Sequence, residues 1–510
     1  MNQRKAGTIL TYIYIFVSNT ISIFYTPYAL QIMGQNEYGL FGTASSFISY
    51  LSILNFGIGG AYIRFNAKCR AENDREGEKR LNGMFLTVFS ILAILVLIGG
   101  SVCVLLVGKL VSNTFTELEI VKLRIIMILL IVNLMITFIF NVVTMALQAY
   151  EKYIFIRIVT LVVSLVTPVV NIIALNMGGR AIAISAISLS LSILSYLLYF
   201  AYSRKAIKLQ FAFNGFRKDV MLQIFTFSGY LFLNSITDQI TGSTDSIILS
   251  ATKGTAAVAV YTIGANFKSY FQQFSQAVSG CFAPMLNMMV AKNVEINDLD
   301  EVFKRVGRIQ FYVISLILIG YLSIGERFVL LWAGEGYLES FYIGLLLMLA
   351  AFIPAFQNIG VEIQKALNKH KARSIVYFLI AILNIVLTIP FSIWWSGIGA
   401  ALATMLCMLL GHGLFMNIYY NNVIGLDIIG FWKSIGSILP GYIFPCLAGF
   451  LINRYCLIDS FAEVLLCAII IIVIYLISIW NFSMNRYEIN LIKSLMYRLS
   501  IKLKNKRSVS

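Results

Sequence analysis

Long apolar stretches recur along the whole chain, and they constrain its fold more than any other feature. Each runs for about 20 residues or more, the length that a helix needs to cross the hydrocarbon core of a bilayer. A backbone in lipid must satisfy its own hydrogen bonds, so only helices or closed barrels can span it. The stretches are continuous rather than alternating, and therefore predict helices. With 59% hydrophobic and 12% charged residues, the composition argues against a soluble fold.

The pattern predicts an all-α polytopic membrane protein with about fourteen transmembrane helices. The expected ranges are 8–33, 38–66, 82–108, 122–148, 153–176, 180–202, 220–250, 256–290, 309–332, 338–366, 372–395, 397–420, 431–453 and 460–482. The first apolar stretch is too long for the core of a signal peptide, so we expect it to be a retained helix.

Basic residues are distributed unevenly between the two sides of this arrangement. The chain carries a net charge of +16, and Lys and Arg gather in alternate loops such as 67–80, 203–208 and 365–373. About 29 of the 39 basic residues fall on that side, which places both termini in the cytoplasm. Membrane orientation thus accounts for the charge, and no nucleic-acid partner is expected.

The two halves of the chain show signs of an internal repeat. One ungapped shift brings Gly34 onto Gly254 and Tyr50 onto Tyr270, and it also superposes the expected spans and the basic loops. An even number of helices per copy gives both copies the same orientation, so we predict two six-helix lobes related by a pseudo-two-fold axis along the membrane normal. The predicted parts are an N-lobe at 1–203, a basic cytoplasmic linker at 204–219, a C-lobe at 220–424, and an extra C-terminal helix pair with a basic tail at 425–510.

The seventh expected span carries two carboxylates on one helical stripe. The stripe consists of Asn234, Asp238, Thr241 and Asp245, at spacings of four, three and four. Charges at membrane depth are costly and normally face the interior of a bundle, paired or in water. The eighth span places Lys268 at about the depth of Asp238, and Gln272 one turn further on. We therefore expect Lys268 and Asp238 or Asp245 to face a shared cleft, although an ion pair that only fixes helix packing is the alternative.

Other polar positions are weaker candidates for the same cleft. Asn141 belongs to a polar stripe in the fourth span, and Glu362 follows Pro354 in the tenth. Such stripes are often hydrogen-bonded contacts between helices. Arg64 and Arg157 lie near the inner ends of their spans, where guanidinium groups suit phosphate oxygens. For both arginines, snorkelling towards the interface is the alternative.

No set of residues in the sequence indicates catalysis or a metal site. The seven cysteines are scattered, mostly in or beside apolar stretches, and lack the spacing of metal ligands. His412 is isolated within the twelfth span, where helix–helix hydrogen bonding is the expected role. Neither a nucleophile elbow nor a phosphate-binding glycine loop is present.

Two segments resemble a known family. The first, at 30–65, reads LQIMGQNEYGLFGTASSFISYLSILNFGIGGAYIRF, and the second, at 146–159, reads ALQAYEKYIFIRIV. They are similar to the opening of bacterial polysaccharide flippases and to that family's turn between spans four and five. The residues that carry the first similarity are Gly34, Tyr38, Gly39, Gly57, Gly59 and Arg64.

The resemblance implies the fold of the multidrug/oligosaccharidyl-lipid/polysaccharide exporter superfamily, with two six-helix lobes in a V. It implies an O-antigen or capsule flippase in a bacterial cytoplasmic membrane, which moves an anionic polyprenyl-diphosphate-linked glycan between leaflets and serves a polysaccharide polymerase. On this reading the translocation residues are Arg64, Asn141, Arg157, Lys268 and Gln272. The candidates for coupling to a proton or sodium gradient are Asp238, Asp245 and Glu362. No cofactor and no covalent chemistry are expected, so the protein is not expected to be an enzyme.

Two other functions remain open at this stage. A cation-coupled drug exporter would share the fold, and uptake of cationic dyes by vesicles would favour it. An intramembrane glycosyl- or acyltransferase would need an acidic or histidine site near a loop, often with a long outer loop. Neither feature is evident in the sequence.

Overall fold

The computed structural model describes residues 3–55, 58–214, 218–367, 369, 371–490 and 493–494, and these residues form helices and no strand. The chain divides into two compact units. Unit 1 contains Met1–Asn266 and Lys371–Cys407, and unit 2 contains Phe267–His370 and Met408–Ser510. Both α8 and the chain that follows α12 therefore run from one unit into the other.

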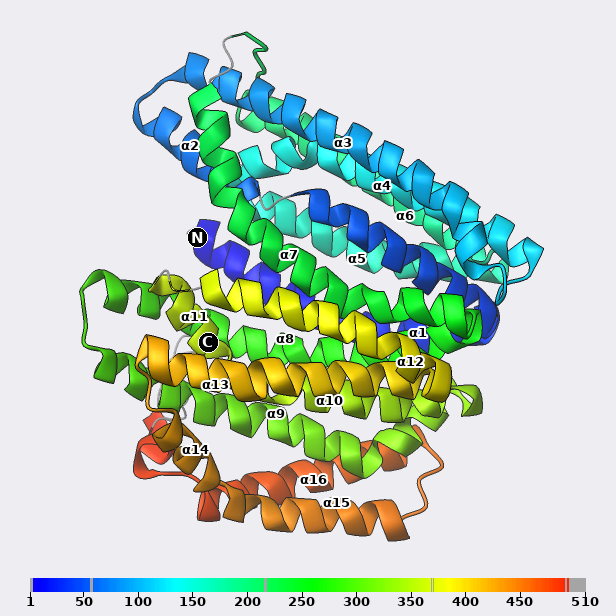
Figure 1. Cartoon of the computed structure of the whole chain (residues 1–510), viewed down its shortest axis with the longest axis vertical. Coiled ribbons are helices and arrows are strands. Elements are labelled where there is room, and N and C mark those ends of the chain that lie inside the picture. The colour runs from blue at the N-terminus through cyan, green and yellow to red at the C-terminus, as the bar shows by residue number, and fades with distance from the viewer. Residues whose placement is uncertain are drawn as a thin grey trace, which may run out of the picture. The chain divides into compact units, whose positions relative to one another are not determined.

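Unit 1 holds the N-terminal helices together with a later segment of the chain. Within it, α3, α4 and α6 run side by side, and α1 packs along α5 (Figure 1). Its elements are α1 (Gln3–Ser52), η1 (Ile53–Asn55), α2 (Gly59–Ala71), α3 (Arg75–Val111), α4 (Glu117–Ala149), α5 (Tyr153–Asn176), α6 (Ala181–Ala206), α7 (Lys218–Thr252), the start of α8 (Thr255–Ala291) and nearly all of α12 (Lys371–Met408).

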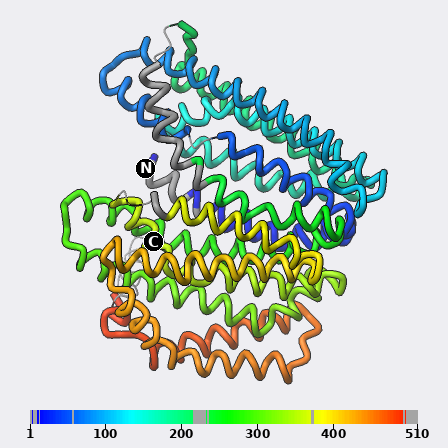
Figure 2. The backbone as a smooth tube through the Cα atoms, viewed as in Figure 1, coloured from blue at the N-terminus to red at the C-terminus, as the bar shows by residue number. Residues whose placement is uncertain are grey.

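Unit 2 is built around α9, which packs against α10, α15 and α16. The last two of these form a hairpin, drawn in orange and red in Figure 2. The elements are the rest of α8, α9 (Ile296–Ala333), η2 (Glu335–Tyr337), α10 (Glu339–Phe356), α11 (Asn358–Ala366), η3 (Leu409–Phe415), α13 (Met416–Tyr419), η4 (Tyr420–Ile424), α14 (Ile428–Gly436), η5 (Leu439–Tyr442), α15 (Ile443–Tyr455) and α16 (Phe461–Phe482).

The glycines of the first quoted segment have specific structural roles. Gly34 interrupts α1 with φ 75° and ψ 171°, a conformation that glycine adopts without the steric cost of a side chain. Gly39 lies directly against the start of α8, where an added Cβ would come within 1.9 Å of the Thr255 carbonyl oxygen. Gly57 lies outside the described residues. The segment is therefore glycine-rich because the chain must turn and then pack backbone against backbone.

A second break reverses the direction of α12. Trp395 and Ser396 have non-helical dihedral angles, with Ser396 at φ 52° and ψ −135°. Beyond the break, a Cβ on Gly399 would lie 1.9 Å from the Phe391 carbonyl oxygen, so the two arms meet closely at the turn. The reversal matters for the site described below, because it brings residues of both arms together.

Capping residues define the ends of several helices. Thr116 and Glu119 form a reciprocal capping box at the start of α4, and Ser460 and Glu463 do the same for α16. Asp74 accepts a hydrogen bond from the Gly77 N–H at the start of α3. These caps satisfy the backbone N–H groups that a helix end leaves without partners.

The surface and the helices confirm the predicted fold class. Large apolar side chains point outward, including Phe450 at 65% and Leu465 at 63% exposure, as expected for a surface that faces lipid. Within the described residues, nine helices are long and apolar enough to cross a membrane, or ten if the bent pair Ile428–Gly436 and Leu439–Tyr455 is one span. Two of the nine, Ile13–Ala71 and Arg373–Ile424, contain the breaks and each cover two expected ranges. The protein is thus an all-α polytopic membrane protein.

Candidate functional site

Asp245 is a buried carboxylate inside unit 1. It lies on α7, and only 2% of its surface is exposed. Three hydroxyl groups donate hydrogen bonds to it. Thr404 reaches Oδ2 at 2.8 Å, Thr388 reaches Oδ1 at 3.2 Å, and Tyr261 from α8 also bonds Oδ2. Hydroxyl donors stabilise an ionised carboxylate in a medium where isolation would be costly.

The reversal of α12 places its two arms around this carboxylate. Asn384 and Thr388 lie on the first arm, and Thr404 lies on the second. Twenty residues of straight helix would separate Asn384 from Thr404 by about 30 Å. Instead, the Asn384 amide donates to Thr404 Oγ1 at 3.0 Å. The turn at 395–396 is therefore what assembles the site.

The site also contains an acceptor that no described group uses. Asn384 is 2% exposed, and its Oδ1 is a buried oxygen with no well-aligned hydrogen-bond donor among the described residues, with the Cys407 thiol beside the same side chain. Buried polar atoms are normally satisfied, so such an oxygen calls for an explanation. Asp245, Thr388, Thr404 and Asn384 together offer one carboxylate and several neutral oxygens. Oxygen ligands of low total charge suit a proton on the carboxylate or a small monovalent cation.

Asp238, seven residues earlier on α7, also faces α12. Its side chain is exposed, and it interacts electrostatically with Tyr377. The guanidinium of Arg373 lies over the Tyr377 ring at 4.8 Å. Asp238 thus meets the first arm of α12 at Tyr377, and Asp245 meets the same arm at Thr388. Asn234, the first member of the predicted stripe, has a side chain outside the described part of the structure.

Three of the predicted translocation residues lie elsewhere in unit 1. Asn141 on α4 donates to Asn55 Oδ1 at 3.3 Å, which joins it to η1. Arg64 on α2 is exposed, and Arg157 on α5 is half-buried, near enough to Tyr199 for an electrostatic interaction. None of these contacts tests a role in translocation, which remains a prediction for all three.

The other predicted site residues belong to unit 2. Lys268 and Gln272 are half-buried on α8, while Glu362 on α11 forms an ion pair with Lys365 at 2.8 Å. A pairing of Lys268 with Asp238 or Asp245 would join the two units, and it remains a prediction. Two serines further along α8 have a packing role. Ser275 donates to the Ala355 carbonyl, and Ser279 accepts from Asn358 at 2.9 Å.

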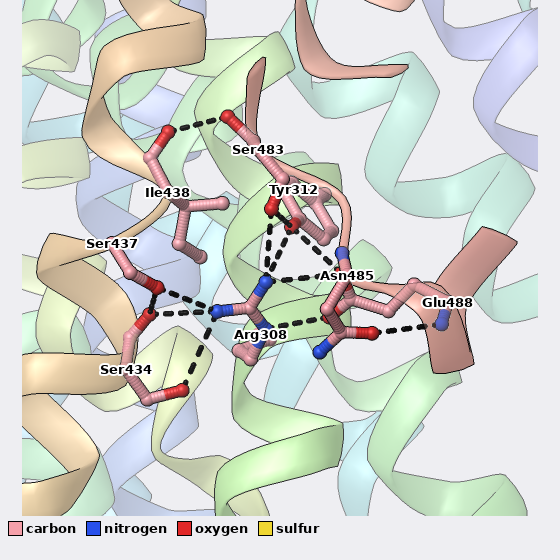
Figure 3. A network of polar contacts seen from close by, with 8 residues as sticks. All are labelled: Arg308, Tyr312, Ser434, Ser437, Ile438, Ser483, Asn485 and Glu488. Carbon is pink, nitrogen blue, oxygen red and sulfur yellow. Dashed lines mark hydrogen bonds and ion pairs between the residues drawn. The ribbon is translucent and has the colours of Figure 1, made fainter. Parts of the chain in front are cut away.

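A second buried charge cluster ties the end of the chain to α9. In Figure 3, Arg308 donates to both carboxylate oxygens of Glu488, at 2.6 and 3.0 Å. It also donates to the Ser434 carbonyl, the Ser437 hydroxyl and the Ser483 carbonyl, at 2.8, 2.9 and 3.0 Å. Asn485 and Glu488 cap each other reciprocally. The contacts of Arg308 with Ser434, Ser437, Ser483 and Glu488 link α9 to α14 and its C-terminal end and to the chain after α16, so they have a structural role.

Several residues of the Asp245 site were not singled out in the sequence, although a signal was present. Asn384, Thr388 and Ser392 repeat at a spacing of four in an apolar helix, the same rule that identified the stripes in other spans. Tyr261 and Thr404 carry no such periodic signal. Thr404 reaches Asp245 beside Thr388 and Asn384 because of the break at 395–396, which local sequence does not specify.

Neither a metal cluster nor a role for His412 emerges from the described residues. Within the described ranges, no three or more His, Cys, Asp or Glu side chains are grouped so that they could hold a metal ion. His412 lies in η3, and its carbonyl accepts a hydrogen bond from Asn417 at 3.1 Å.

Comparison with known proteins establishes the family. Residues 5–290 match the family described as "Polysaccharide biosynthesis protein", and the chain belongs to it. No curated protein matches the chain.

Solved structures share the fold at low sequence identity. The lipid II flippase MurJ in an inward closed conformation aligns with a TM-score of 0.68 at 16% identity, over 97% of this chain and 100% of MurJ. An inward-facing multidrug resistance transporter of the MATE family in the MOP superfamily gives 0.60 at 14%, over 81% and 96%. The Vibrio cholerae MATE transporter VcmN gives 0.54 at 13%, over 84% and 98%. These similarities place the chain in the flippase and exporter fold.

Proposed function

We propose that the protein flips polyprenyl-diphosphate-linked oligosaccharide across the bacterial cytoplasmic membrane for the synthesis of O-antigen, capsule or exopolysaccharide. The observation that carries the proposal is membership of a polysaccharide biosynthesis family by a chain with a transporter fold. A polar glycan and a diphosphate cannot cross hydrocarbon unaided, whereas the lipid chain can remain in the bilayer. No chemical step is part of this mechanism, so the protein acts as a transporter rather than an enzyme.

Translocation would proceed by alternating access between two six-helix halves, with both termini in the cytoplasm. Arg64, Arg157 and Lys268 would contact the diphosphate, because Arg and Lys are suited to phosphate oxygens. Asn141 and Gln272 would bind sugar hydroxyl groups. A polysaccharide polymerase would use the product in the outer leaflet.

We infer that Asp245 couples this cycle to a proton or sodium gradient. The support is the burial of the carboxylate among hydroxyl groups, together with the nearby amide oxygen that has no described donor. A cation would add its charge to the hydroxyl donors that already bond the carboxylate and would also give the Asn384 oxygen a partner. Binding energy that differs between two conformations is what a gradient needs to drive a transport cycle. Asp238 and Glu362 remain further candidates for this role.

Deletion and complementation test the proposed function in cells. Loss of the gene should abolish surface polysaccharide and leave lipid-linked oligosaccharide in the inner leaflet, and the wild-type gene should restore both. Normal surface glycan in the deletion strain, in the absence of a second flippase, would contradict the proposal.

A cation-coupled drug exporter is the second candidate, because MATE transporters have the same fold. Inverted vesicles that contain the protein would then accumulate cationic dyes when a sodium or proton gradient is imposed. Dye accumulation without a glycan defect would favour the exporter. A glycosyl- or acyltransferase would require His412 or an acidic group for chemistry, so His412→Ala should leave surface glycan intact.

A further inference from the structure

The first arm of α12 has a buried face and an exposed face along its length. Asn384 and Thr388 belong to the buried face, from which Thr388 reaches Asp245. The opposite face is apolar, and its side chains are between 42% and 59% exposed at spacings of four and three: Ile375, Leu379, Ile382, Val386, Ile389 and Ile393. This spacing keeps them on one side of the helix, so they form a continuous apolar stripe within the lipid-facing surface.

The length of the apolar stripe matches the thickness of a bilayer core. From Ile375 to Ile393 a helix rises by about 27 Å. The hydrocarbon core of a bilayer is about 30 Å thick. Arg373 precedes the stripe, and its guanidinium lies over the Tyr377 ring at 4.8 Å. A cationic side chain thus marks one end of the stripe, and the other end is expected at the opposite edge of the core.

Two tryptophans mark that other end. Trp394 and Trp395 follow Ile393 directly, and with exposures of 65% and 52% they are the most exposed of the chain's five tryptophans. Their ring centroids are 5.8 Å apart, and Phe391 packs beside both at 6.2 and 5.4 Å. We call Phe391, Trp394 and Trp395 the tryptophan corner. It lies at the turn where the two arms of α12 meet.

The chemistry of the tryptophan corner suits the boundary between hydrocarbon and water. An indole has an apolar ring and one N–H donor, and such side chains gather at membrane interfaces, where the ring contacts acyl chains and the donor reaches polar groups. A sugar ring can also stack on an indole. The corner, however, directly continues the lipid-facing stripe, and it lies where a stripe of core length ends. Both observations favour the bilayer as its partner.

We propose that the tryptophan corner binds the headgroup layer of the bilayer and holds the first arm of α12 at a fixed depth. The proposal goes beyond the proposed function and does not depend on which substrate the protein moves. Thr388 lies about 9 Å from Trp394 along the helix axis. The corner therefore also sets the depth of the Asp245 site, about 9 Å from this interface.

Quenching of tryptophan fluorescence in nanodiscs tests the proposal on the full-length protein. The signal of the corner is the difference between the wild type and the double variant Trp394→Phe with Trp395→Phe. Spin-labelled phosphatidylcholine carries the quencher either on the headgroup or at the middle of an acyl chain. The headgroup label should quench the corner signal about twofold more than the mid-chain label does.

A tryptophan introduced elsewhere on the apolar stripe provides the matched control. Val386 is 59% exposed and lies about 12 Å from Trp394 on the same arm. Val386→Trp, added to the double variant and measured against it, should show the reverse order, with stronger quenching by the mid-chain label. The same order of quenching at both positions would overturn the proposal.

Iodide in the surrounding water distinguishes the other partners of the corner. Strong quenching by iodide without quenching by either lipid label would place the corner in water and overturn the proposal. Protection from both iodide and the lipid labels would mean that protein or glycan covers the corner, which would overturn it as well.

Photolabelling of the wild-type protein gives a result that does not depend on any variant. The probe is phosphatidylcholine with a diazirine on its headgroup, in the same nanodiscs, and labelled residues are assigned by fragmentation in a mass spectrometer. Label is expected within residues 391–396. A map with label on other segments of the protein and none within 391–396 would overturn the proposal.

Discussion

Two buried carboxylates in this protein differ in the groups that donate hydrogen bonds to them. Glu488 in unit 2 is held by both arms of the Arg308 guanidinium, and the remaining donors of Arg308 are used by serine oxygens. Asp245 in unit 1 is bonded by hydroxyl groups, and a buried amide oxygen beside it has no described donor. The first cluster pairs its carboxylate with a cationic side chain and fills its hydrogen bonds. The second combines its carboxylate with hydroxyl groups, and we proposed above that it binds a proton or a cation.

The contrast indicates how to distinguish a structural charge from a functional one in a membrane protein. Burial alone does not decide, because Asp245, Glu488 and Arg308 are all at least 94% buried. What differs is the kind of contact that the structure shows: a guanidinium that donates to both oxygens of Glu488, against three hydroxyl groups at Asp245 with the Asn384 amide oxygen nearby. An ion pair whose hydrogen bonds are all made has no position left for a further ligand. An amide oxygen without a hydrogen-bond donor can coordinate a cation.

The largest expected effect comes from breaking the saturated pair. Arg308→Ala leaves Glu488 buried without its counter-charge and should lower the free energy of unfolding by about 3–5 kcal/mol. Denaturant unfolding in detergent micelles measures this. The double variant Arg308→Met with Glu488→Leu should recover most of the loss, because no lone charge remains. Equal instability of the single and double variants would show that the pair is not the cause.

The next effect concerns the charge at Asp245. Asp245→Asn keeps the size of the side chain but removes the carboxylate, so it should weaken binding of the coupling ion about 100-fold, or about 2.7 kcal/mol. If the coupling ion is sodium, sodium should stabilise the purified protein more than choline does at the same ionic strength. If the coupling ion is a proton, the stability should depend on pH instead. An ion response in the variant equal to that of the wild type would remove Asp245 from the coupling site.

Removal of a single neutral ligand should have a smaller effect. Thr388→Val preserves the shape of the side chain but deletes one hydroxyl, and we expect about tenfold weaker ion binding, or about 1.4 kcal/mol. Thr241→Val is the matched control, because the Thr241 hydroxyl bonds the Thr237 carbonyl of its own helix at 2.8 Å. Equal losses in the two variants would mean that the effect does not arise from ion ligation.

The smallest effect is expected at Glu362. Its partner Lys365 has a side chain that is 57% exposed, and such ion pairs contribute about 0–1 kcal/mol. Glu362→Gln should therefore leave both stability and flipping close to those of the wild type. A large loss of gradient-driven flipping with normal stability would instead assign Glu362 to the coupling machinery.

The sequence predicts the fold class well because hydrophobicity in lipid is a strong constraint. Long apolar stretches and short basic loops are sufficient to predict the helices and a polytopic membrane fold. The roles of Gly34 and Gly39 were also signalled locally, since a break in α1 and a close approach to Thr255 both require a small residue.

The sequence predicts the site only in part. Asp245 was identified because a carboxylate in an apolar helix is conspicuous. Its partners Thr388 and Thr404 were not, since hydroxyl groups are common in membrane helices and their meeting depends on the turn at Ser396. The Arg308 cluster was missed for a different reason. Arg308 reads as one more basic residue near a cytoplasmic loop, and only the contact with Glu488, far along the chain, makes it distinctive.

Reconstituted flipping driven by an imposed gradient tests the account most directly. Proteoliposomes would contain a fluorescent lipid-linked oligosaccharide, and appearance of the label in the opposite leaflet would be followed with and without a sodium or proton gradient. The account predicts that wild-type protein flips the substrate faster under one of these gradients. It also predicts that folded Asp245→Asn protein does not respond to either gradient. Wild-type protein that moves no substrate, or a variant that keeps the full gradient response, would contradict it.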